Sequence, residues 1–326
     1  MTLSREVEQA LIEVTEVAAI ASARTMGRGD RHLADQLATE AMRTRLGEVD
    51  IDGRIVIGEG ERDEAPMLFI GEELGAGVGR DDVAAIDIAV DPLEGTNLCA
   101  TGSPGAVCVL AASERGGLLH APDVYMEKIV VGPTARGSIH LDAPVAENLE
   151  GIAKALGRQV EDLTIVVLER DRHQQLIEDI RATGARIHLL TDGDLAPAIA
   201  AAVRGTGVHA VMGVGGAPEG VITAAAMRCL GGEIQGRLAT RTEKQERRLE
   251  EVGVENPERL LHTEDLAPGE EIVFSCTGVT KGDLLESVRF FGGGSRTHTL
   301  FMSSSRNLIR FVDTIHRESA ATPVLF

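Results

Sequence analysis

The chain has 326 residues, of which 43% are hydrophobic and 25% charged, and it contains no tryptophan and one tyrosine. Its 51 acidic and 32 basic residues give a net charge of −19, which argues against nucleic acid or an anionic membrane as a partner, since both bind basic surfaces. No apolar run reaches the roughly 18 residues that a membrane span needs, and four isolated cysteines with no basic-then-apolar leader indicate a cytoplasmic protein with reduced thiols.

Two helices are predicted at the start of the chain. The first covers residues 2–24 and ends at the glycines of residues 26–30, and the second covers about residues 33–45. One apolar stripe supports the first helix and consists of Val7, Leu11, Val14 and Ala18. Asp35 lies near the start of the second helix, where the local sequence favours a role in capping the helix or complementing its dipole.

Two predicted strands, residues 55–57 and 86–90, are each followed by clustered carboxylates. Asp91 and Glu94 follow the second strand, and the first is followed by Glu59, Glu61, Asp63 and Glu64. Either cluster alone is compatible with an ordinary solvated acidic turn. Ligands of α/β proteins bind outside the carboxyl ends of strands, so the repetition favours a site for two hard divalent metal ions.

The next predicted elements are a strand at residues 106–112, a hairpin turn at the glycines of residues 116–117, and a loop and strand at residues 121–133. Tyr125 is the one tyrosine, and a half-buried packing role with a solvated hydroxyl is the ordinary interpretation. Lys128 is predicted to lie on the surface.

A βα rhythm follows the helical stretch at residues 141–157 and indicates an α/β fold. Strands are predicted within residues 164–173, 185–194 and 208–220, each with a polar end and a helix after it. Two further strands, residues 272–279 and 297–305, carry no functional signal of their own.

Arg170 and Arg172 come at the end of the first of these βα units. Residues i and i+2 of a strand share a face, so both guanidinium groups are predicted to point at one anion. The alternative is a surface ion pair with Glu169 or Asp171. His173 is predicted to cap or pack, because no nucleophile and base form an evident pair near it.

The motifs resemble, in order and over almost the whole chain, the class II fructose-1,6-bisphosphatases. They read VIGEGERDEAP, DIAVDPLEGTN, APDVYMEK, TDGD, GVGGAPEGVITAAA and TGVTKGDLLE. The segment SVRFFGGGSRTHTL is similar to the branch in photosynthetic bacteria that also accepts sedoheptulose 1,7-bisphosphate. DPLEGT is a variant of the signature of the wider lithium-sensitive phosphatase superfamily, with Glu94 where most members have aspartate.

The resemblance implies a layered αβαβα sugar-phosphatase fold and a homotetramer. Residues 1–150 would form a metal-binding subdomain, and residues 151–326 would complete the sugar-phosphate pocket. The implied activity is hydrolysis of the 1-phosphate of fructose 1,6-bisphosphate and of sedoheptulose 1,7-bisphosphate, in gluconeogenesis and the Calvin cycle. AMP inhibits enzymes that the chain resembles, and no residue pattern here locates an AMP site.

The resemblance also implies the site residues. One Mg²⁺ or Mn²⁺ ion would be held by Asp35 and Glu59, and the other by Asp91, Glu94 and Glu219. Thr96, oriented by Asp35 and with Glu61 nearby, would position the attacking water. The substrate would be bound by Glu94, Gly95, Thr96, Tyr125, Arg170, Asp171, Arg172, Asp192, Gly193, Asp194 and Gly216. Asp171 departs from the family pattern and is unfavourable near a phosphate unless it points away.

Two alternatives to this function stay open from the sequence. A related metal-dependent phosphatase would act on inositol phosphate or a nucleotide 3′-phosphate. A nucleotide-binding regulatory protein or dehydrogenase would leave the strand-end carboxylates unexplained. Cys99, three residues beyond Thr96, is either an ordinary buried residue or a point of redox control.

Overall fold

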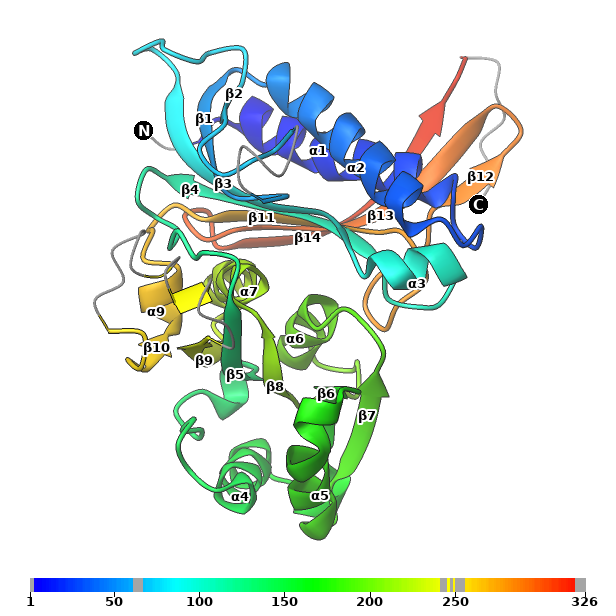
Figure 1. Ribbon diagram of the computed structural model, residues 1–326. Helices are drawn as coiled ribbons and strands as arrows, with labels where there is room; N and C mark the ends of the chain where they lie inside the picture. Colours follow the sequence, from blue (N-terminus) through cyan, green and yellow to red (C-terminus); the bar gives the residue numbers. More distant parts are fainter. Residues whose placement is uncertain (1–2, 61–66, 241–244, 247–248, 250–255, 320–326) are drawn as a thin grey trace. The chain divides into compact units, whose positions relative to one another are not determined.

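The computed structural model describes residues 3–319, except for residues 61–66, 241–244, 247–248 and 250–255. It consists of two compact units (Figure 1): unit 1 is Met1–Gly117 with Glu270–Phe326, and unit 2 is Leu118–Gly269. This division differs from the boundary expected at residue 150, because the chain leaves unit 1 earlier and returns to it for its last strands.

Unit 1 is built on an eight-stranded sheet in which seven strands have the order β12-β13-β11-β4-β3-β1-β2 and the eighth, β14, pairs with β13. Its strands are β1 (Ile51–Ile57), β2 (Glu73–Leu74), β3 (Ala84–Glu94), β4 (Val107–Glu114), β11 (Val273–Gly278), β12 (Arg289–Phe291), β13 (Gly294–Ser303) and β14 (Leu308–Arg317). Its helices are α1 (Arg5–Ala23), α2 (Arg31–Gly47) and α3 (Thr96–Thr101). Among the described strands of unit 1, β1 and β3 are the one pair that runs in parallel, so their carboxyl ends lie side by side.

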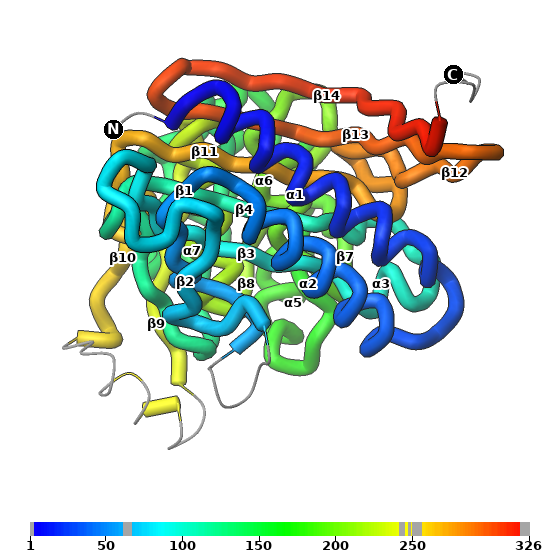
Figure 2. Tube along the Cα trace, turned by 90° about the horizontal axis from the view of Figure 1, so that it is seen from above, coloured from blue at the N-terminus to red at the C-terminus, as the bar shows by residue number. Residues whose placement is uncertain are grey.

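Helices α1 and α2 run side by side over the unit 1 sheet, as Figures 1 and 2 both show. The predicted apolar stripe of α1 is buried in the core together with Met42 and Leu46 of α2. Ser4 caps α1 by accepting a hydrogen bond from the Val7 N–H, and Asp30 caps α2 by accepting one from the Leu33 N–H. The capping role that the local sequence favoured for Asp35 therefore belongs to Asp30.

Buried polar contacts join α1 to the C-terminal strands of unit 1. The Thr277 hydroxyl of β11 donates to the Thr15 hydroxyl at 2.8 Å, and the Thr297 hydroxyl of β13 donates to Glu16 at 3.0 Å. Ser303 donates to Glu8 at 3.0 Å. The hydroxyls of Thr297 and Ser303 satisfy carboxylates that would otherwise be costly to bury, and these contacts help to hold the residues after 270 in the first unit.

Unit 2 contains a six-stranded sheet with the order β10-β9-β5-β8-β6-β7. Its strands are β5 (Tyr125–Val131), β6 (Thr164–Leu168), β7 (Arg186–Leu190), β8 (Ala210–Gly216), β9 (Glu233–Ala239) and β10 (Leu261–His262). Its helices are α4 (Val145–Leu156), α5 (Gln174–Ala182), α6 (Leu195–Ala202), α7 (Ala217–Leu230), α9 (Thr263–Leu266) and the 3₁₀ turns η1 (Pro133–Ala135), η2 (Val160–Asp162) and η3 (Asp171–His173).

Helices cover both faces of the unit 2 sheet. Ile129 and Ile165 pack with Leu149 of α4 on one face, whereas Met126 lies against Gly220 of α7 on the other. Unit 1 thus supplies a helix layer and a sheet layer, and unit 2 supplies helix, sheet and helix layers. The predicted α/β fold class is confirmed.

The prediction of a hairpin turn at residues 116–117 is wrong. Strand β4 pairs with β3 and β11, whereas β5 pairs with β8 and β9. The two glycines therefore lie where the chain passes from unit 1 to unit 2, and the local turn signal does not reveal which strands pair.

Candidate metal and substrate site

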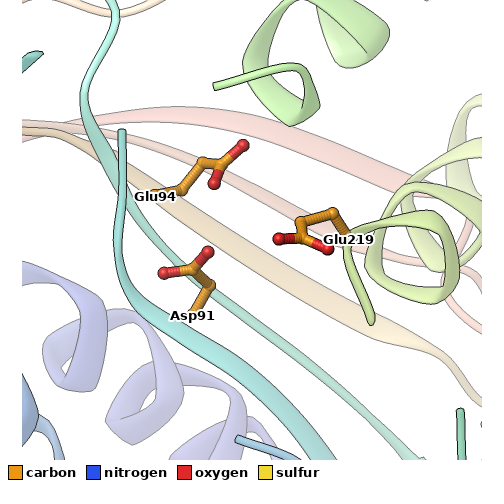
Figure 3. Close-up of side chains that lie close together, drawn as sticks. All are labelled: Asp91, Glu94 and Glu219. Atoms are coloured by element: carbon orange, nitrogen blue, oxygen red, sulfur yellow. The ribbon is translucent and has the colours of Figure 1, made fainter. Parts of the chain in front are cut away.

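A β-bulge at the end of β3 brings Asp91 and Glu94 to the same face of the sheet. Asp91 pairs with Val109 and Glu94 with Val107, so two residues of β3 lie opposite one residue of β4, and β3 carries one extra residue between the two pairs. Side chains three residues apart in a regular strand would point to opposite faces, and the bulge corrects this. A carboxylate oxygen of Asp91 lies within 4.8 Å of one of Glu94 (Figure 3).

The negative charge of Asp91 and Glu94 affects a residue two strands away in the same sheet. Cys276 of β11 pairs with Val109, which in turn pairs with Asp91. Burial raises the pKa of the Cys276 thiol, and the charges of Glu94 and Asp91 raise it further. The end of β3 is therefore a region of negative potential, and a cation is the species that it would attract.

Asp35 and Glu59 form a second carboxylate pair in unit 1. Asp35 comes from the second turn of α2, and Glu59 follows β1. Burial and then the charge of Asp35 raise the pKa of Glu59 from its ordinary value of 4.5 to about 8. Burial also raises the pKa of Asp35. The structure thus brings together the two residues assigned to one metal, whereas Glu61 lies outside the described residues.

Thr96 begins α3 directly after a glycine in the left-handed conformation. Gly95 has a φ of 79°, and this turn follows the bulge without a side chain that would be strained there. The Thr96 hydroxyl donates to the Leu93 carbonyl at 3.0 Å. Its oxygen consequently keeps lone pairs that can accept a hydrogen bond from a water molecule.

In unit 2, the predicted substrate residues gather at one edge of the sheet. Strands β6, β7 and β8 are parallel, so their carboxyl ends lie on the same side, and β5 starts there because it runs antiparallel to β8. The residues at this edge are Tyr125, Arg170, Asp171, Arg172, Asp192, Gly193, Asp194 and Gly216. Tyr125 is paired directly with Gly216.

The two arginines reach this edge from a 3₁₀ turn. Strand β6 ends at Leu168, so the prediction that Arg170 and Arg172 share a strand face is wrong. The Arg172 guanidinium lies over the Tyr125 ring, 5.2 Å from its centroid, and donates to the Val214 carbonyl. The Arg170 guanidinium lies 3.9 Å from Asp192. Asp171 is exposed.

His173 has a packing role, as predicted. Its Nδ1 lies 2.7 Å from the Leu168 carbonyl, and its Nε2 accepts the Val214 N–H at 2.8 Å. These partners require a neutral ring with the proton on Nδ1. The imidazole therefore fastens β8 to the end of β6.

Lys128, which the sequence predicted to be a surface residue, is only 3% exposed. Its ammonium lies 2.9 Å from Asp194 and 3.4 Å from the Gly216 carbonyl. A Cβ at Gly215 would lie 2.3 Å from Asp194 and 3.0 Å from Lys128, so the backbone of β8 is pressed against the ion pair. The alternation of Met126, Lys128 and Val130 along β5 was the signal that this lysine faces inward.

Glu219 lies in the first turn of α7 with an unsatisfied carboxylate oxygen. Its Oε2 is buried and has no hydrogen-bond partner among the described residues. Burial raises its pKa, and Lys128 opposes that increase. A Cβ at Gly216 would lie 1.8 Å from Oε2, so a larger residue there would have to displace this carboxylate. A buried carboxylate oxygen without a donor is the chemistry that a metal ion satisfies.

Carboxylates at strand ends, a buried lysine and an arginine over an aromatic ring are the features of a metal-dependent enzyme that acts on an anionic, hydroxyl-bearing substrate. The family model of bacterial fructose-1,6-bisphosphatase, glpX-encoded, matches residues 5–316. The chain therefore belongs to this family of phosphoric monoester hydrolases.

Relatives in cyanobacteria are similar over nearly their full length. The D-fructose 1,6-bisphosphatase class 2/sedoheptulose 1,7-bisphosphatase of Synechococcus sp. (strain JA-3-3Ab) is 53% identical, covering 96% of each chain. The protein of the same name from Gloeobacter violaceus is 50% identical, covering 94% of each chain. A crystal structure of the extragenic suppressor protein suhB from Bartonella henselae is 15% identical, covers 61% of this chain and 74% of that one, and has a TM-score of 0.35. Among the described residues, no helix is long and apolar enough to cross a membrane.

Replacing Lys128 with methionine should lower the free energy of unfolding by about 3–5 kcal/mol, because Asp194 would stay buried without its cationic partner. Urea unfolding of the metal-free protein measures this. Lys154→Met, on the exposed side of α4, is the matched control and should change the free energy by less than about 0.5 kcal/mol. Equal effects of the two substitutions would contradict the assignment of a buried ion pair.

The raised pKa of Glu59 predicts how pH and metal act together. Between pH 4.5 and about 8 the folded protein keeps a proton that the unfolded chain has lost, so the free energy of unfolding of the metal-free protein should fall as pH rises. Metal binding at pH 7 should then release protons, and affinity should increase with pH. Calorimetry in two buffers of different ionisation enthalpy counts these protons. Glu59→Gln should release about one fewer, and an unchanged number would contradict the prediction.

Proposed function

We propose that the protein hydrolyses the 1-phosphate of fructose 1,6-bisphosphate and of sedoheptulose 1,7-bisphosphate. The observation that carries the proposal is the pair of carboxylate clusters at the ends of the parallel strands β1 and β3, because two such clusters suit two metal ions on one phosphate. The names of the cyanobacterial relatives, which join both activities, support the choice of substrates.

We assign Asp35 and Glu59 to one Mg²⁺ or Mn²⁺ ion, and Asp91, Glu94 and Glu219 to the other. An all-oxygen donor set favours these hard cations over zinc. The unsatisfied Oε2 of Glu219 supports its inclusion. When bound, the two ions would screen the phosphate charge, lower the pKa of a water molecule and stabilise the leaving alkoxide.

Thr96 would hold the attacking water. Its hydroxyl proton is directed to the Leu93 carbonyl, so the oxygen would accept a hydrogen bond from the water and leave a lone pair of the water free to attack. Asp35 would orient this arrangement, and Glu61 would be a further acid beside it. Glu94 and Gly95 would contact the reacting phosphate, because they directly precede Thr96 in the chain.

The edge of unit 2 would bind the sugar and its second phosphate. Arg170 and Arg172 supply guanidinium groups, and the Arg172 guanidinium stacks over the Tyr125 ring. The 192–194 segment supplies acceptors for sugar hydroxyls, with Asp194 fixed by Lys128. Gly216 lets the substrate approach the backbone of β8. Asp171 is exposed, and we propose that it points away from the phosphate.

The cellular setting belongs to the same proposal. We place the enzyme in the cytoplasm as a homotetramer that serves gluconeogenesis and the Calvin cycle, with AMP as an inhibitor. The names of the relatives include a sedoheptulose 1,7-bisphosphatase activity, which supports the role in carbon fixation.

Phosphate release from the two sugar bisphosphates tests the proposal. The purified protein should release phosphate from both with Mg²⁺ or Mn²⁺ and lose that activity on chelation. Release from fructose 1,6-bisphosphate alone would leave only the first half of the proposal. If neither sugar is hydrolysed while inositol phosphate or a nucleotide 3′-phosphate is, the substrate assignment is wrong.

Thr96→Ala extends the same assay to the role of the hydroxyl. It should lower kcat by about 100-fold or more and leave KM within a few-fold, since a positioned water matters chiefly in the transition state. Thr101→Ala, at the exposed end of α3, is the matched control and should behave like the unaltered protein. A rise in KM with kcat unchanged would instead assign Thr96 to substrate binding.

A further inference from the structure

A partly buried ion pair joins helix α2 to the segment that follows β1. The Arg43 Nε of α2 donates to Glu72 Oε1 at 2.8 Å. The arginine side chain is 42% exposed, whereas that of Glu72 is only 7% exposed. The sequence gives no sign of this contact, because Glu72 sits in an ordinary acidic pair with Glu73.

The second carboxylate oxygen of Glu72 accepts a hydrogen bond from Leu68, whose backbone is strained. Glu72 Oε2 accepts the Leu68 N–H at 2.5 Å. Leu68 is fully buried and has a φ of 52°, a left-handed conformation that is unfavourable for a residue with a side chain. The hydrogen bond from its N–H to a carboxylate is charge-assisted and offsets part of this cost.

Leu68 in turn is hydrogen-bonded to the backbone of Glu59. The Leu68 carbonyl accepts the Glu59 N–H at 3.0 Å, and it lies so close to β1 that a Cβ at Gly58 would be 1.9 Å from its oxygen. The Ile70 N–H donates to the Gly60 carbonyl at 2.9 Å. Glu59 is therefore fixed between two backbone hydrogen bonds from the segment that Glu72 anchors.

We infer that Glu72 is a positioning residue for the Asp35–Glu59 metal site, acting through Leu68 and clamped by Arg43. Asp35 and Arg43 belong to the same helix, so one ion pair connects both ligand-bearing segments. The inference rests on the metal assignment in the proposed function. Residues that orient metal ligands commonly change metal affinity or activity by 10–100-fold when altered.

The role requires a carboxylate in particular. Both oxygens of Glu72 accept hydrogen bonds, one from Arg43 and one from the Leu68 N–H. Glutamine offers one acceptor oxygen and one NH₂ group, so one of the two donors would face another donor. Glu72→Gln should therefore release either the clamp or the strained peptide without changing the size of the side chain.

The experiment compares Glu72→Gln with Glu73→Gln, which removes the same charge from the exposed neighbouring residue. Calorimetric titration with Mn²⁺ measures affinity without substrate, and Glu59→Gln identifies the binding event that belongs to this site. Glu72→Gln should weaken that event by about 10–100-fold and leave the other within a few-fold, while Glu73→Gln matches the unaltered protein. A folded Glu72→Gln protein with unaltered Mn²⁺ affinity at this site would overturn the inference. So would a Glu59→Gln protein that binds Mn²⁺ like the unaltered protein, because Glu59 would then not be a metal ligand.

Arg43→Met is a second variant that keeps the inference testable if Glu72→Gln does not fold. The Arg43 side chain is partly exposed, so its replacement should disturb folding less than a change at buried Glu72. It should weaken the same event by a smaller factor, and Arg31→Met at the exposed start of α2 should not. Saturating Mn²⁺ should restore most of kcat, whereas a merely stabilising ion pair would lower the unfolding temperature with affinity unchanged. If the sugar bisphosphates are not hydrolysed but the affinity losses appear, the proposed function fails and this inference stands.

Discussion

Repulsion between carboxylates at the ends of neighbouring strands is the constraint on which unit 1 depends. Asp91 and Glu94 share a face at the end of β3, and Glu59 follows the parallel strand β1 and faces Asp35. Such groups must be protonated, hydrogen-bonded or neutralised by a cation. Glu59 shows the first outcome, because its pKa is raised to about 8. A divalent ion at the proposed sites would give the third outcome and would couple metal binding to pH and stability in this unit.

The two units manage buried charge in different ways. In unit 1 the carboxylates are placed by backbone devices, namely the bulge in β3 and the segment that Glu72 anchors beside Glu59. In unit 2 the cation is a side chain of the protein. Lys128 pairs with Asp194 and lowers the cost of burying the Glu219 carboxylate. The first arrangement leaves negative charge at the proposed metal sites, and the second compensates negative charge within the protein at the proposed sugar-binding edge.

Much of the fold follows from local patterns, but its pairing does not. The helices, the βα units and the carboxylates after β1 and β3 were predictable, since periodicity and turn residues act locally. Strand partners depend on distant residues, so neither the passage between units at Gly117 nor the return at Glu270 was visible. The prediction that Lys128 lies on the surface was wrong, because it gave more weight to the charge of the side chain than to the alternation of inward and outward residues along the strand. The role of Glu72 arises only when Arg43 is brought to it by the fold.

The number of metal ions bound to each chain is the most direct test of the two-cluster site. Equilibrium dialysis with Mn²⁺, followed by elemental analysis, should find two ions on the unaltered protein. Glu59→Gln and Asp91→Asn should each bind one, because each variant weakens a different cluster. A single ion on the unaltered protein, or the same single ion lost in both variants, would contradict the assignment of two separate metal sites.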